Sequence, residues 1–83
     1  MNNTRELLEN LSKLHTTKLG LERIKRNLKL KDIDNDIVDF CRRLIVSDEC
    51  LIQKRGKNWY CSKDNIVITV NSYSLTIITA HKN

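Results

Sequence analysis

The chain has no proline and only two glycines, and no run of apolar residues approaches the about 20 needed to cross a bilayer. This scarcity leaves little material for flexible linkers or for the glycine-rich loops that hold phosphates in nucleotide-binding proteins. The first ten positions contain two acids and four uncharged polar side chains, where a secretion signal has a basic cap and an apolar block. We therefore expect neither a membrane span nor a signal peptide.

Cysteine occurs three times, but not in the patterns that bind metals or build disulfide frameworks. Cys41, Cys50 and Cys61 are an odd number, and no two of them form a C-x-x-C pair. Structural zinc sites use closely spaced ligand pairs, which are missing here. We predict no metal, no cofactor and reduced thiols, which is typical of a cytoplasmic protein.

The 83 residues are too few for two separate cores, so residues 1–83 are predicted to form one domain. Fifteen basic residues against ten acids give a net charge of +5. Six Lys or Arg and one acid lie between residues 18 and 31, and four with no acid lie between 54 and 63. Basic segments of this kind attract phosphates, so we expect contact with RNA, with an ordinary solvated surface as the alternative.

The spacing of apolar residues in the first half predicts three helices. Their predicted ranges are 4–14, 18–30 and 35–47. The third has the clearest core-facing stripe, which consists of Ile37, Val38, Cys41, Leu44 and Ile45. Thr16 or Thr17 is expected to cap the second helix.

After Ser47, β-branched and aromatic residues dominate and short polar turns interrupt them, which indicates strands. The predicted strands are 50–55, 58–62, 66–70 and 75–81. In the last one, strict alternation places Ile77 and Thr79 on one face and Ile78 and Ala80 on the other. The predicted fold class is α+β, with three N-terminal helices followed by a four-stranded antiparallel β-meander that the helices cover on one face.

The two histidines, His15 and His81, lie far apart in the sequence. Metal-independent RNA cleavage needs one neutral and one protonated imidazole, and an ordinary histidine pKa near 6.5 allows both forms. If they are the catalytic pair, their side chains must approach within about 5 to 8 Å around one phosphate. The alternative is a solvated loop histidine and a second one on the surface near the C-terminus.

The sequence also contains cations, amides and aromatic residues that are suited to bind RNA. Trp59 and Tyr60 point to opposite faces of their predicted strand, so one enters the core and the other can present a ring to a base. Either assignment is open for Tyr60, and Trp59 is a core residue or a stacking platform. The candidate phosphate- and RNA-binding residues are Arg23, Lys25, Arg26, Lys57, Asn58, Tyr60, Asn71, Thr79 and Lys82.

The segments LHTTKLGLERIKRNL, GKNWY and ITVNSYSLTIITAHK, within positions 14–28 and 56–82, resemble a family of small bacterial proteins catalogued as a domain of unknown function. The resemblance implies a shared pattern of mostly polar residues: His15, Thr16, Thr17, Arg23, Lys57, Asn58, Trp59, Asn71, Thr76, Thr79 and His81. Relatives often carry a histidine where Tyr73 stands and an aromatic residue where Leu75 stands. If that histidine is essential in the family, this chain has lost the activity.

More remotely, the predicted architecture is similar to the barnase, EndoU, colicin D and RelE group of metal-independent ribonucleases. This likeness implies RNA cleavage of a toxin-like type, although fold analogy is weak evidence of activity. The alternative is a non-catalytic module that binds nucleic acid or a protein, such as an inhibitor or antitoxin-like partner from a mobile element. A protein partner is therefore possible beside RNA.

Overall fold

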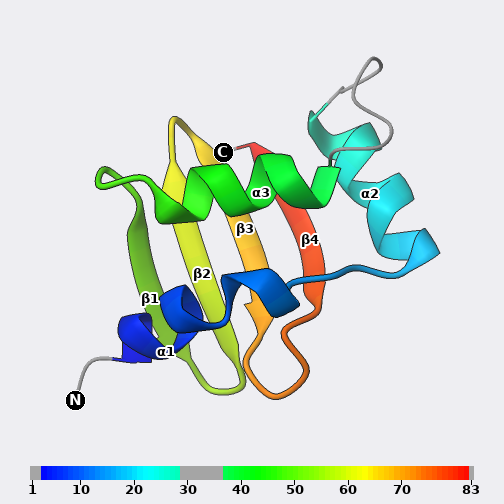
Figure 1. Cartoon of the computed structure of the whole chain (residues 1–83). Coiled ribbons are helices and arrows are strands. Elements are labelled where there is room, and N and C mark those ends of the chain that lie inside the picture. Colours follow the sequence, from blue (N-terminus) through cyan, green and yellow to red (C-terminus); the bar gives the residue numbers. More distant parts are fainter. Residues whose placement is uncertain (1–2, 29–36, 83) are drawn as a thin grey trace.

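The computed structural model describes residues 3–28 and 37–82 of the chain (Figure 1). The ends predicted at 29–30 and 35–36 for the second and third helices lie outside these residues. The elements are α1 (Asn3–Glu9), the short 3-10 helix η1 (Leu11–Lys13), α2 (Lys18–Leu28), α3 (Ile37–Val46), β1 (Leu51–Arg55), β2 (Asn58–Lys63), β3 (Ile66–Asn71) and β4 (Ile77–Lys82).

The strands form one sheet in the order β1-β2-β3-β4, and each neighbouring pair is antiparallel. Tight turns make this possible because their residues adopt the left-handed backbone conformation. Gly56 does so between β1 and β2, at φ 59°, and Asp64 and Asn65 do so between β2 and β3, at φ 52° and 68°. Two consecutive residues with positive φ favour the turn that matches the twist of an antiparallel hairpin.

The predicted order of three helices followed by a purely antiparallel meander is wrong. The first helix ends at Glu9 instead of residue 14, and an extended segment follows η1. In this segment His15 forms a parallel bridge with Thr76, next to the start of β4. Along the chain, α2 and α3 therefore lie between this sheet-bound residue and β1. The physical reason is the outer edge of β4, whose backbone groups need partners: Ile77 N–H donates to the His15 carbonyl at 2.7 Å.

The hydrophobic core lies between the sheet and its helices. α1 and α3 lie over the same face, and α2 runs alongside β4 (Figure 1). Trp59 is 1% exposed, which settles its assignment as a core residue. The predicted stripe of α3 enters this core at Ile37, Cys41, Leu44 and Ile45. None of the helices in residues 3–28 and 37–82 is long and apolar enough to cross a membrane.

A β-bulge in β4 overturns the alternation predicted there. Val70 pairs with Ile77 and Thr69 pairs with Thr79, so Ile78 is an extra residue without a partner on β3. The bulge turns both Ile77 and Ala80 toward the core, where each is 0% exposed. Strict alternation would have placed these two residues on opposite faces.

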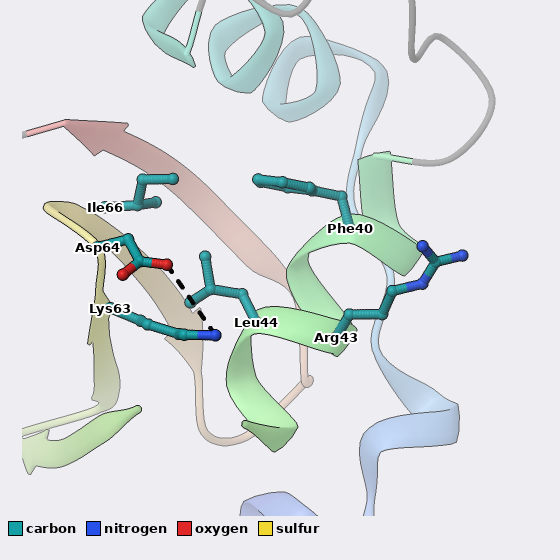
Figure 2. A pocket seen from close by; sticks show the side chains of 6 residues that line it. All are labelled: Phe40, Arg43, Leu44, Lys63, Asp64 and Ile66. Atoms are coloured by element: carbon teal, nitrogen blue, oxygen red, sulfur yellow. Dashed lines mark ion pairs between the residues drawn. The ribbon is translucent and has the colours of Figure 1, made fainter. Parts of the chain in front are cut away.

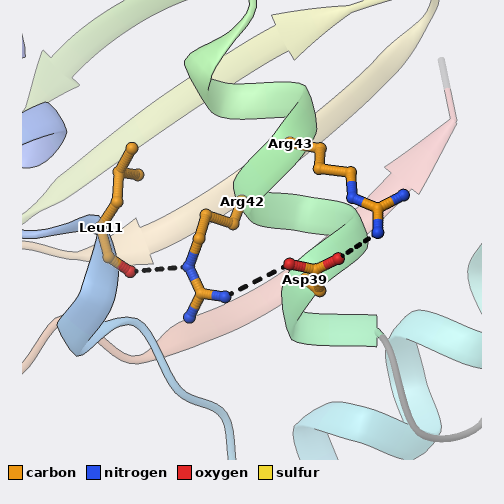
Figure 3. A network of polar contacts seen from close by, with 4 residues as sticks. All are labelled: Leu11, Asp39, Arg42 and Arg43. Carbon is orange, nitrogen blue, oxygen red and sulfur yellow. Dashed lines mark hydrogen bonds and ion pairs between the residues drawn. The ribbon is translucent and has the colours of Figure 1, made fainter.

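Arg42 connects α3 to η1 within the helical layer. Its Nε donates a hydrogen bond to the Leu11 carbonyl of η1 at 2.9 Å, as Figure 3 shows. Asp39, one turn earlier on α3, pairs with Arg42 at 3.5 Å and with Arg43 at 2.6 Å. One carboxylate therefore orients two guanidinium groups, and one of these fixes η1 against α3.

Candidate functional site

His15 lies at one end of the sheet and is held from both sides of its ring. Nδ1 is 3.0 Å from the Lys13 carbonyl, and Nε2 is 3.0 Å from the Thr76 hydroxyl. A carbonyl oxygen only accepts, so Nδ1 must carry a proton and donate it to Lys13. In the neutral imidazole, Nε2 then accepts from Thr76. This geometry leaves His15 oriented like a general base, but its acceptor nitrogen is occupied.

The hydrogen bonds continue from Thr76 into the β3–β4 turn. The Thr76 and Ser74 hydroxyls are 2.7 Å apart. Because Thr76 donates to His15, the Ser74 hydroxyl proton is shared between Thr76 and Asn71 Oδ1, which lies at 3.2 Å. The same Oδ1 accepts from the backbone N–H groups of Tyr73 and Ser74. Leu75 has φ 60° in this turn, an unfavourable conformation for a non-glycine residue. Asn71 and Thr76 therefore have structural roles in shaping the turn.

The β1–β2 turn lies beside the β3–β4 turn. The Ser72 N–H donates to the Lys57 carbonyl at 2.8 Å, and Asn58 pairs with Asn71 across β2 and β3. Four predicted site residues thus gather at this end of the sheet, which we name the turn end: His15, Lys57, Asn58 and Asn71. Among the described residues, Asn58 Oδ1 and the Ser72 hydroxyl are buried there without a hydrogen-bond partner.

The structure does not bring the two histidines together. His15 bridges to Thr76, whereas His81 lies five residues further along and pairs with Val67. Five residues of extended chain span about 17 Å, well beyond the about 5 to 8 Å that one shared phosphate allows. The paired-histidine arrangement predicted from the sequence therefore does not form. Lys82 also lies at this far end, opposite Ile66.

Tyr60 occupies the centre of the sheet face opposite the core. Alternation along β2 turns it away from Trp59 and Cys61, which are buried under the helices. Its neighbours across the strands are Gln53 on one side and Thr69 on the other, and Thr69 pairs in turn with Thr79. The helices α1 and α3 lie over the opposite face, and α2 runs alongside β4 (Figure 1). Thr69 is only 7% exposed, so the β4 side of this face is partly covered.

We call this surface the open face. By strand register it carries eleven residues, Leu51, Gln53, Arg55, Asn58, Tyr60, Ser62, Val67, Thr69, Asn71, Thr79 and His81. The register thus assembles five of the predicted site residues on one surface: Asn58, Tyr60, Asn71, Thr79 and His81.

The predicted residues of α2 lie elsewhere. Arg23 and Arg26 are exposed and Lys25 is half-buried on a helix that packs along the edge of β4. Asn27, which the sequence did not single out, donates to the Thr79 hydroxyl at 3.3 Å and to the Ala80 carbonyl at 3.2 Å. Asn27 therefore satisfies a backbone carbonyl at the edge of β4 and uses the Thr79 hydroxyl as a second acceptor. The sequence signal that could have identified Asn27 is a polar residue on the side of an amphipathic helix that faces the sheet.

The cysteines and acids do not assemble a metal centre in residues 3–28 and 37–82, where no group of three or more His, Cys, Asp or Glu side chains could hold an ion. All three thiols are free. Burial raises the pKa of Cys41 to about 12. A hydrogen bond from the Cys61 thiol lowers the pKa of Cys50, and the same contact together with burial raises that of Cys61. These are mainly packing residues.

A family model described as a protein of unknown function, DUF3781, matches residues 8–81. The chain belongs to this family. The match takes in α2, α3, β1, β2 and β3 completely and β4 up to His81. It confirms the resemblance to a small family of unknown function that the sequence motifs suggested. No curated protein and no solved structure matches the chain significantly. The DUF3781 description names no activity, so function must be argued from the site itself.

Proposed function

We propose that this DUF3781 protein binds single-stranded RNA across the open face of its sheet. The observation that carries the proposal is the position of Tyr60, a half-buried aromatic ring in the centre of the sheet face opposite α1 and α3. A ring on a sheet is a sequence-tolerant platform for a base, and stacking contributes about 1 to 3 kcal/mol per base.

Polar and charged side chains around Tyr60 suit the rest of a nucleotide. Asn58 and Asn71 lie side by side at the turn end, where their amide NH2 groups can donate to base edges. Their oxygens are not offered to a base, because the turn occupies Asn71 Oδ1 and Asn58 Oδ1 is buried. Arg55 shares the open face with them, and Lys57 follows in the adjacent turn. These cations lie where phosphates of a strand stacked on Tyr60 would pass. His81 offers a further contact at the opposite end of the same face.

Binding without cleavage is the form of the proposal that the geometry supports. Cleavage by two imidazoles requires both beside one phosphate, and His15 and His81 lie at opposite ends of β4. We also place the protein in the cytoplasm. The three free thiols support this placement, because oxidising compartments favour disulfides.

The decisive experiment measures binding of a fluorescently labelled single-stranded oligoribonucleotide by anisotropy at low salt. Replacing Tyr60 with leucine is expected to weaken binding about 5- to 150-fold, the equivalent of one stacked base. Tyr73→Leu is the matched control, because Tyr73 is 78% exposed on the β3–β4 turn and lies off the open face. Equal effects of the two substitutions would contradict the assignment of the open face.

The same RNA, separated on a gel after incubation, tests cleavage. We expect intact RNA with the parent protein. Turnover that is lost in both His15→Ala and His81→Ala would instead identify a ribonuclease and overturn our assignment. If the parent protein fails to bind RNA at low salt, the proposal is wrong, and the basic surface is to be assigned to a protein partner.

A further inference from the structure

A cavity of about 300 Å³ opens between α3 and the β2–β3 hairpin, on the helix-covered side of the sheet. Its lining is Phe40, Arg43, Leu44, Lys63, Asp64 and Ile66. Figure 2 shows the α3 residues on one side of it and the hairpin residues on the other. This volume is at the lower end of the range for small-molecule pockets, so it suits one base or nucleoside.

Three of the six lining residues are apolar, and one of these is aromatic. Phe40 is only half-buried, and it lies outside the core-facing stripe of α3. Leu44 and Ile66 complete the apolar lining. A half-buried aromatic ring beside aliphatic side chains makes a slot for a flat ring, because aromatic groups stack face to face with an offset.

Two charged groups of opposite sign stand side by side at this cavity. Lys63 Nζ is 4.0 Å from Asp64 Oδ2, which is an ion pair but too long for a hydrogen bond. The Lys63 side chain is 23% exposed and that of Asp64 is 77% exposed. Each group therefore keeps hydrogen-bonding capacity toward a ligand. Arg43 differs, because Asp39 already holds its guanidinium at 2.6 Å.

We infer that this cavity binds a guanine base. Guanine presents two neighbouring N–H donors, at N1 and N2, to the two oxygens of a carboxylate, and the adjacent O6 accepts from an ammonium group, a pairing common for lysine. Adenine, cytosine and uracil lack two adjacent donor positions. Asp64 takes the two donors, Lys63 takes O6, and Phe40 stacks on the ring. The guanine belongs to a free nucleotide or to an unstacked residue of an RNA.

The site is independent of the proposed RNA contact through Tyr60. Alternation along β2 places Lys63 on the same face as Trp59 and Cys61, opposite to the open face. Substitutions at one surface therefore leave the other in place, and the two proposals can fail separately.

Calorimetric titration of the full chain with nucleoside monophosphates tests the inference. Guanosine monophosphate is expected to bind saturably, inosine monophosphate about tenfold more weakly because it lacks the 2-amino donor, and the other three nucleotides more weakly still. Equal heats for all nucleotides, or no saturable binding of guanosine monophosphate, would overturn it.

Substitutions then assign the contacts. Asp64→Asn preserves the backbone, because asparagine tolerates positive φ, and it is expected to remove the preference for guanosine over inosine monophosphate. Lys63→Met and Phe40→Leu should each weaken the binding of guanosine monophosphate at least tenfold and leave the circular dichroism spectrum unchanged. Asp48→Asn is the control, since this exposed residue lies outside the cavity. If Asp64→Asn and Asp48→Asn act alike, the assignment of Asp64 is wrong.

The source of the base is resolved with two labelled strands, a uridine tract and the same tract with one central guanosine. Preference for the guanosine-containing strand that Asp64→Asn removes would identify an unstacked RNA residue. Binding of free guanosine monophosphate with no such preference would identify a free nucleotide. Both results support a guanine site.

Discussion

Gly20 lies in the first turn of α2, where helix propensity alone favours alanine by about 1 kcal/mol. The structure reverses this preference. A Cβ at position 20 would clash with the oxygen of the Thr16 hydroxyl, and this hydroxyl donates to the Ile77 carbonyl at 2.8 Å. The threonine would have to rotate and release that hydrogen bond. We therefore expect Gly20→Ala to lower the free energy of unfolding by about 1 to 2 kcal/mol in urea denaturation.

A second variant separates the clash from other effects of alanine. In a Thr16→Ala background the hydroxyl is gone, so the further change Gly20→Ala should be neutral or stabilising through helix propensity. The same loss in both backgrounds would show that Thr16 is not the group that excludes a side chain at position 20.

The Cys41 thiol makes the free energy of unfolding depend on pH. Its thiol is 0% exposed, and burial raises its pKa from 9.0 to about 12. The neutral thiol is favoured in the folded state, so the unfolded chain releases this proton at lower pH. Stability from this group is complete below pH 9 and is lost as pH rises toward 12, at up to about 1.4 kcal/mol per pH unit.

Comparison with Cys41→Ala checks this term. Between pH 9 and 11 the free energy of unfolding should fall more steeply with pH for the parent protein than for the variant. The difference in slope should correspond to about one proton. The variant will be less stable at neutral pH because it leaves a small cavity, so the slopes and not the absolute values decide the outcome. Parallel profiles would contradict a buried neutral thiol.

At the scale of elements, the β3–β4 turn depends on one side chain. Asn71 Oδ1 accepts from two backbone N–H groups and from the Ser74 hydroxyl. Removing this acceptor by Asn71→Ala is expected to reduce the free energy of unfolding by about 1 to 3 kcal/mol, because the turn loses several hydrogen bonds together.

Asn71→Asp is the matched variant, since a carboxylate keeps the acceptor and should retain most of the stability in thermal unfolding. Because Asn71 also lies on the open face, RNA affinity should be compared only for the well-folded variant. Destabilisation of equal size by alanine and aspartate would show that the acceptor oxygen is not what holds the turn.

At the scale of the whole molecule, the net charge of +5 favours RNA regardless of detailed contacts. The salt dependence of binding distinguishes a defined interface from general attraction. If Lys57 contacts a phosphate, Lys57→Ala should reduce the slope of log affinity against log salt by about 0.7, the value for one phosphate of a single strand.

Arg26→Ala serves as the comparison for anisotropy titrations over a range of salt concentrations. Arg26 is exposed on α2, along the edge of β4 and away from the turn end. A larger reduction of the salt slope for Lys57→Ala than for Arg26→Ala supports the open face as the interface. Equal reductions would indicate attraction to the total charge. A larger change for Arg26 would move the interface to α2, as the sequence also allowed.

The predictability of this fold follows from how local each signal is. The predicted strands 58–62 and 66–70 differ from β2 and β3 by one residue at a single end, and most of the predicted α3 stripe is buried. Alternation and helical spacing are properties of a few consecutive residues, so they can be read directly. The extended segment at His15 was missed because its partner, Thr76, is 61 positions away.

For the candidate site, the sequence by itself determined the kinds of groups available: two imidazoles, side-chain amides, cations, and a tyrosine next to a tryptophan whose burial it left open. Only the tertiary structure decided which of them meet. Strand register gathers Asn58, Tyr60 and Asn71 on one face, and the same register holds His15 and His81 at opposite ends of β4. The physical reason is that the edge of β4 is completed by hydrogen bonds to a backbone segment far away in the sequence, and no local pattern of side chains encodes such a partner.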